Sequence, residues 1–216
     1  MLRCRTTFAL AVFGAIFFAV HAWALETDQQ VLAAERTLRA AELRMDVDET
    51  ALALYRAASQ QAGEVLARNP DSPGANFVYF AATGRILMAD GITKNFFTLV
   101  GLDRMYLDRA ISLDPRYASA LAAKGGTLLD LPTLFGGDPA EGLRLLRRAI
   151  AINPGGVGTR VVLAKGLAQQ GDVAEARVQA RRAAHLACIQ GRRKALFEAT
   201  AILDQLNAPI AKASFH

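Results

Sequence analysis

The chain has 216 residues, of which 52% are hydrophobic and 21% charged, and its formal net charge is +5. The length suits one domain of ordinary size or two small ones, and this composition excludes a disordered chain. Ala, Leu and Arg dominate, which favours helices over a β-sandwich. Two cysteines cannot form a disulfide framework.

Residues 1–24 have the pattern of a secretory signal peptide. A basic start precedes an apolar run over residues 8–20, and small residues flank Trp23 as a cleavage site. We expect cleavage after Ala24 and a periplasmic protein. An uncleaved N-terminal membrane anchor is the alternative, because the run is only somewhat shorter than a span. The expected organisation is a signal peptide (1–24), a helical repeat domain (25–206) and a tail (207–216).

Two segments match without gaps at a constant offset of 34 in the numbering. Gly137-Asp138-Pro139-Ala140-Glu141, continuing to Arg147-Arg148-Ala149, matches Gly171-Asp172-Val173-Ala174-Glu175, continuing to Arg181-Arg182-Ala183. In both, Asp is a helix N-cap, and Glu three residues later completes the pattern of a capping box. We call this offset the repeat period.

Prolines mark the ends of further helices. Asn69-Pro70, Asp114-Pro115 and Asn153-Pro154 each close a segment with helical apolar spacing. Caps and breakers together predict helices near 27–45, 48–68, 73–89, 92–113, 117–130, 139–152, 157–170, 173–189 and 191–206. No strict alternation bounded by turn residues occurs, so we predict an all-α fold without a sheet.

The repeat period and these helix signals resemble the tetratricopeptide repeat (TPR), a helix–turn–helix unit of about 34 residues. The best unit is 155–188. Its residues at the family's large and small packing positions are Leu163, Ala164, Leu167, Gly171, Ala176, Ala180 and Ala183. The resemblance implies a right-handed α-solenoid of antiparallel helix pairs with a concave face. Cys188, within an apolar helical stretch, is expected to be buried.

The segment between residues 131 and 138 is longer and more apolar than a plain repeat turn. It resembles a Pro-x-x-x-Gly-Gly-Asp segment of the T component, a family of TPR-like periplasmic proteins associated with TRAP-type transporters. The residues that carry this resemblance are Pro132, Gly136, Gly137, Asp138, Ala149, Asn153 and Pro154. It implies a scaffold that contacts a periplasmic solute-binding protein. The alternative is structural: Gly136 permits positive φ while Leu134 and Phe135 fill the core.

Aromatic residues gather in the first half of the chain and are absent between 136 and 196. The candidates for an apolar ligand pocket are Phe77, Phe80, Phe96, Phe97, Tyr106 and Phe135. The alternative is that these rings fill the core where the second half uses Ala and Leu. Phe96 and Phe97 are adjacent in a predicted helix, so both cannot easily face one core.

Charge is polarised along the chain. Residues 25–140 carry a net −4, whereas residues 141–194, with 11 basic and 3 acidic side chains, carry +8. We take Arg144, Arg147, Arg148, Arg177, Arg181 and Arg182 as candidates for binding an acidic protein, with an anionic membrane surface as a further candidate. A solvated helix face is the alternative. Nucleic acid is not expected as a partner.

No catalytic constellation is apparent. His185 and Cys188 lack a second pair of metal ligands, Gly155-Gly156-Val157-Gly158 lacks the context of a phosphate loop, and no nucleophile elbow occurs. We expect no enzyme, cofactor or metal. The sequence therefore predicts an exported protein-interaction scaffold, with accessory subunit of a TRAP-type system as its specific form. The alternative is a periplasmic carrier of an apolar small molecule. The oligomeric state is left open.

Overall fold

The computed structural model describes residues 26–207, and within that range the chain is helical apart from short connections, with no strand. The expected signal peptide and residues 208–216 of the expected tail lie outside the described residues. No helix in the described part is both long enough and apolar enough to cross a membrane.

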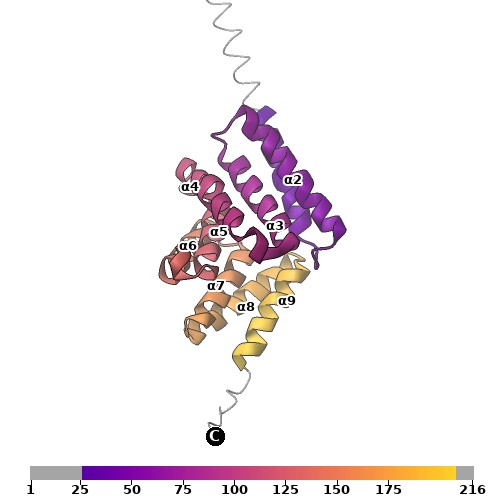
Figure 1. Ribbon diagram of the computed structural model, residues 1–216. Coiled ribbons are helices and arrows are strands. Elements are labelled where there is room, and N and C mark those ends of the chain that lie inside the picture. Colours follow the sequence, from indigo (N-terminus) through magenta and orange to yellow (C-terminus); the bar gives the residue numbers. More distant parts are fainter. Residues whose placement is uncertain (1–25, 208–216) are drawn as a thin grey trace, which may run out of the picture.

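Residues 26–42 form the first helical segment. The elements that follow are α2 (Glu49–Arg68), α3 (Pro73–Leu102), a π-helical turn η1 (Asp103–Leu107), α4 (Asp108–Leu113), α5 (Ala118–Asp130), a 3₁₀ turn η2 (Thr133–Phe135), α6 (Pro139–Ile152), α7 (Val157–Gln169), α8 (Val173–Ile189) and α9 (Arg193–Asn207). In Figure 1 they follow one another from the N-terminal end at the top to α9 at the bottom.

The predicted caps of the two matched segments are confirmed. Asp138 accepts a hydrogen bond from the Glu141 backbone N–H, and Asp172 accepts one from Glu175, both at 3.0 Å. The other half of each capping box does not form. The cap N–H groups donate instead to backbone carbonyl oxygens of the preceding helix. The two glutamates pair with arginines, so only the aspartates act as caps.

The predicted break after residue 89 is confirmed as a kink inside α3. Gly91 alone departs from helical geometry, with φ 129° and ψ 116°, and α3 continues on both sides of it. A side chain disfavours this φ, so glycine is required at the kink. Residues 92–113 then run through the π turn into α4 and end at Asp114, as predicted.

Helices pack mainly against their neighbours in the chain. The most extensive contacts are α2 with α3, α5 with α6, α7 with α8 and α8 with α9; α5 also touches α7, and α7 touches α9. Because the connections are short, paired helices are antiparallel. The buried side chains form separate clusters, one shared by residues 26–42, α2 and α3 and another by α7, α8 and α9. A series of local cores is the expected property of a repeat array.

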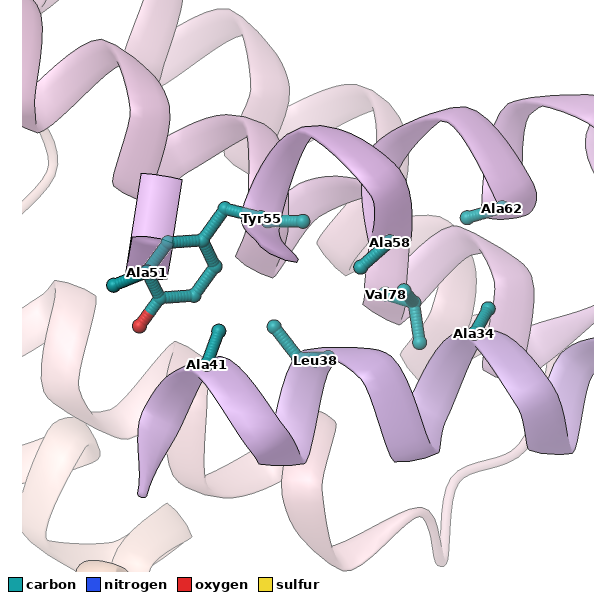
Figure 2. Close-up of a cluster of buried hydrophobic side chains, with 9 residues drawn as sticks. Ala34, Leu38, Ala41, Ala51, Tyr55, Ala58, Ala62 and Val78 are labelled. Carbon is teal, nitrogen blue, oxygen red and sulfur yellow. The ribbon is translucent and has the colours of Figure 1, made fainter. Parts of the chain in front are cut away.

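Small residues dominate these cores. Figure 2 shows Tyr55 and Leu38 among the alanines of the first helical segment and α2. Of the packing residues predicted for 155–188, Leu163, Leu167 and the four alanines are buried, which confirms them. The packing role predicted for Gly171 is wrong, because Gly171 is exposed and has the positive φ of a turn residue, 82°. Alanine lets helix axes approach closely, which compensates for its small apolar area.

Helices α5 and α6 approach each other closely. A Cβ atom on Gly125 would lie 2.8 Å from the Gly142 carbonyl oxygen, and one on Gly142 would lie 2.8 Å from the Gly125 carbonyl oxygen. The two backbones are therefore in direct contact, without an intervening side chain. The neighbouring Gly126 is different, because its Cβ would meet only Val162 at an ordinary 3.6 Å.

The expected burial of Cys188 is wrong, because the thiol is exposed. Helix α8 buries Ala180, Ala183 and Ala187. Cys188 follows Ala187 directly, about 100° around the helix, and so leaves the buried face.

Adjacent glycines of α5 should respond oppositely to alanine. Gly125→Ala should lower the free energy of unfolding by about 1–3 kcal/mol, because its Cβ collides with the α6 backbone. Gly126→Ala should raise it by up to about 1 kcal/mol, because alanine is the better helix former and the space is free. Urea denaturation followed by circular dichroism measures both; equal effects would contradict the close contact.

Candidate interaction surfaces

The six candidate aromatic residues do not converge on one pocket. Phe77 and Phe80 pack against the core cluster of Leu107, Ala110 and Ala120. Tyr106 packs against Tyr79, with ring centroids 4.6 Å apart. The remaining three gather at the surface, where the Phe96 ring meets Phe97 at 5.5 Å and Phe135 at 4.8 Å. The rings thus divide between core and surface.

The loop between α5 and α6 has a defined geometry. The Asp138 N–H donates to the Leu128 carbonyl oxygen at 3.0 Å, and the Gly137 N–H donates to that of Pro132 at 3.1 Å. Gly136 has φ 95°. A Cβ on Gly137 would overlap the carbonyl of Leu131, so this turn requires glycine. The Pro-x-x-x-Gly-Gly-Asp pattern is therefore the description of one tight, hydrogen-bonded turn.

The turn points its apolar residues outward. Leu134 is 87% exposed and Phe135 39% exposed, so the expectation that they fill the core is wrong. Phe97, from the part of α3 beyond the kink, is 79% exposed and lies 6.5 Å from Phe135 between ring centroids. We call Phe96, Phe97, Leu134 and Phe135 the aromatic patch.

The six candidate arginines divide into three pairs by their contacts. Arg144 and Arg147 form ion pairs with Glu141 and Glu175, each at 2.5 Å. Arg148 and Arg177 donate to the carbonyl oxygens of Pro115 and Leu206. Arg181 and Arg182 are exposed and line a pocket. The arginines therefore do not form one uniform basic face.

That pocket has a volume of about 410 Å³ and lies where α7 begins and α8 ends. Its lining consists of Pro154, Arg160, Arg181, Arg182, His185 and Leu186. We call it the basic pocket. Sequence reasoning missed Arg160, although the signal was present: Arg160 is placed after Pro154 as the buried Leu121 is placed after Pro115.

A buried ion pair was also missed, and no sequence pattern marked it. The Lys124 ammonium on α5 donates to Asp103 of η1 at 2.5 Å and lies 2.8 Å from Asp108. Asp103 is only 5% exposed, and its second carboxylate oxygen has no hydrogen-bond partner. Burial raises the pKa of Asp103, against the opposing effect of Lys124. The ion pair therefore joins η1, which follows α3, to α5.

Among residues 26–207 no group of three or more His, Cys, Asp or Glu side chains could hold a metal ion. The aromatic patch offers apolar contact, and the basic pocket offers guanidinium hydrogen-bond donors.

Removing the cation of the buried pair should destabilise the protein strongly. Lys124→Met keeps the aliphatic stem but leaves the Asp103 charge buried, which should lower the free energy of unfolding by about 3 kcal/mol at pH 7. Lys165→Met is the control, because its pair with Asp130 spans 3.7 Å and is exposed; it should change stability by less than about 0.5 kcal/mol.

The loss in Lys124→Met should also shrink as the pH falls. Burial raises the folded-state pKa of Asp103 above the unfolded value, so the folded state binds the proton more readily and acid favours folding at this site. Urea denaturation at a series of pH values measures this. A loss that grows on acidification would contradict an unpaired buried carboxylate.

No protein-family model matches the chain, and no curated protein matches it. Among solved structures the chain is similar to TTC0263, described as a thermophilic TPR protein in Thermus thermophilus, with a TM-score of 0.49 and 19% identity over 83% of this chain and 93% of that one. It is also similar to the MamA RS-1 ArsTM double mutant, with a TM-score of 0.44 and 14% identity over the same shares. The interpretation as a TPR-like array depends on the repeat period, caps and helix pairs of this chain.

Proposed function

We propose that this protein is an exported, non-enzymatic scaffold that binds another protein through the aromatic patch. The observation that carries the proposal is the exposure of Phe97 and Leu134, at 79% and 87%, beside a turn whose backbone is tightly fixed. Large apolar side chains that a rigid framework holds in water form a ready contact, because their burial is favourable and little ordering is required.

The specific form of the proposal is an accessory subunit of a TRAP-type transport system in the periplasm. Its support is the resemblance of Pro132, Gly136, Gly137 and Asp138 to the T-component loop, together with the signal-like residues 1–24. The partner would be the solute-binding protein of that system. The same loop that carries the resemblance also carries half of the aromatic patch, so motif and contact surface coincide.

The alternative of an apolar small-molecule carrier has less support. A carrier requires rings that surround one enclosed volume. Here Phe77 and Phe80 pack in a core cluster, Tyr106 contacts Tyr79, and Phe97 projects into solvent. The aromatic residues have the arrangement of a contact surface and of separate core contacts.

Shortening the exposed apolar side chains should weaken partner binding without unfolding the array. We expect Phe97→Ser combined with Leu134→Ser to weaken binding of the TRAP-type solute-binding protein at least tenfold, because exposed aromatic anchors commonly contribute more than about 1.4 kcal/mol. Isothermal titration calorimetry between the two purified proteins measures this, with circular dichroism as a check on folding.

Phe197→Ser is the matched control, since Phe197 is 65% exposed but lies on α9. It should leave the affinity within a factor of two. Unchanged binding by the double variant would reject the aromatic patch as the contact. If the solute-binding protein does not bind the unmodified chain, the TRAP-specific form is wrong. Saturable binding of a lipophilic ligand that is lost in Phe97→Ser would favour the carrier.

A further inference from the structure

The turns at Pro70, Pro115 and Pro154 share one kind of hydrogen bond. In each turn the proline carbonyl oxygen accepts from a side chain. The donors are Asn76 to Pro70 at 2.9 Å, Arg148 to Pro115 at 2.6 Å and Arg160 to Pro154 at 2.9 Å. Asn76 and Arg160 occupy the same place after their prolines, whereas the equivalent Leu121 cannot donate and Arg148 takes its role. Each carbonyl oxygen therefore accepts once from this set of donors.

At the third turn, one arginine does not make this hydrogen bond. Arg182 stands one repeat period after Arg148 and is its repeat equivalent. The carbonyl oxygen that Arg182 would bind is that of Pro154, and it already accepts from Arg160. Arg182 has no ion pair within residues 26–207.

Arg181 loses its partner for a different reason. Its repeat equivalent, Arg147, pairs with Glu175 across helices α6 and α8. The position one repeat period beyond Glu175 is Pro209, so the sequence provides no carboxylate there. Arg181 and Arg182 are therefore two arginines whose equivalents, Arg147 and Arg148, are satisfied one repeat earlier.

Both arginines line the basic pocket beside Arg160 and His185, and none of the pocket's residues is acidic. In the part of the chain that the structure describes, none of the three arginines forms an ion pair. Three guanidinium groups around one open volume of about 410 Å³ repel one another unless an anion lies between them.

Arg160 distinguishes the basic pocket from an ordinary solvent-exposed basic surface. It is 5% exposed, and its Nε has no hydrogen-bond partner, while its two terminal nitrogens donate to Gln179 and to Pro154. Burial, reinforced by the positive charge of Arg182, lowers the pKa of Arg160 below its ordinary value. A buried cation without a carboxylate is costly for a fold, and an oxyanion bound beside it would offset that cost.

We propose that the basic pocket is a binding site for a phosphate group. Guanidinium forks match the oxygens of phosphate, and a dianion balances more of the three positive charges than a single carboxylate does. The volume exceeds that of a bare phosphate, and Pro154 and Leu186 offer apolar contact to an attached organic group. The ligand is therefore a phosphate monoester, either a free ester or the headgroup of phosphatidic acid. This site does not depend on partner binding at the aromatic patch.

Calorimetric titration of the purified protein with inorganic phosphate, glycerol 3-phosphate and acetate tests the proposal. We expect saturable 1:1 binding of glycerol 3-phosphate that weakens at least tenfold in Arg181→Gln combined with Arg182→Gln. Arg160→Leu should weaken it similarly, and it should fold because the equivalent Leu121 is a core residue. Flotation with vesicles that contain phosphatidic acid, against phosphatidylcholine vesicles, tests the headgroup as the source.

The matched control is Arg36→Gln combined with Arg39→Gln, two arginines on the first helical segment, outside the pocket, with the same loss of charge. It should leave binding within a factor of two. Soluble-phosphate binding that depends on the pocket assigns a free phosphate ester, and pocket-dependent flotation assigns the headgroup; both support the site. Absence of binding in every arm, an equal loss in the control, or acetate binding as tight as that of phosphate would overturn it.

Discussion

Close contact between helix backbones is the constraint on which the rest of this structure depends. Gly125 and Gly142 bring α5 and α6 together without a side chain between them, and alanines fill equivalent roles in the other pairs. Small residues supply little apolar area each, so no helix pair shields itself. Each pair is covered by the next, which explains why the core consists of separate clusters along the chain.

The aromatic patch lies where this regular packing is interrupted. The connection between α7 and α8 is short, and its residues 170–172 are exposed. The longer connection between α5 and α6 forms a tight turn from which Leu134 and Phe135 project outward. The kink at Gly91 redirects α3, whose second part brings Phe96 and Phe97 to the same place. An insertion and a kink in two different repeats thus meet in one patch.

The sequence predicted the helices well because their signals are local. Asp138 and Asp172 each accept the predicted cap hydrogen bond, and Asp48 and Ser72 cap α2 and α3 in the same way. Pro or Gly follows the end of most helices. The fold class follows from these signals and from the repeat period. Neither requires knowledge of a distant contact.

The sites were harder to predict because they depend on which face of its helix a residue occupies and on which side chains lie beside it. Cys188 leaves the buried face through a single step along the helix from Ala187, which composition does not reveal. The arginines looked alike in sequence, yet Arg147 has a carboxylate on the next repeat and Arg181 has none. The ion pair of Lys124 and Asp103 joins α5 to the π-helical turn η1, and no sequence pattern predicted that turn.

The basic pocket lies where two arginines lack the partners of their repeat equivalents. Glu175 on α8 neutralises Arg147, whereas the equivalent Arg181 has no ion pair within residues 26–207. A bound phosphate would perform for Arg181 and Arg182 the role that Glu175 performs for Arg147. A ligand that binds only the folded state stabilises it, and α8 packs against both α7 and α9. Occupancy of the pocket would therefore stabilise the packing of α8 against α7 and α9.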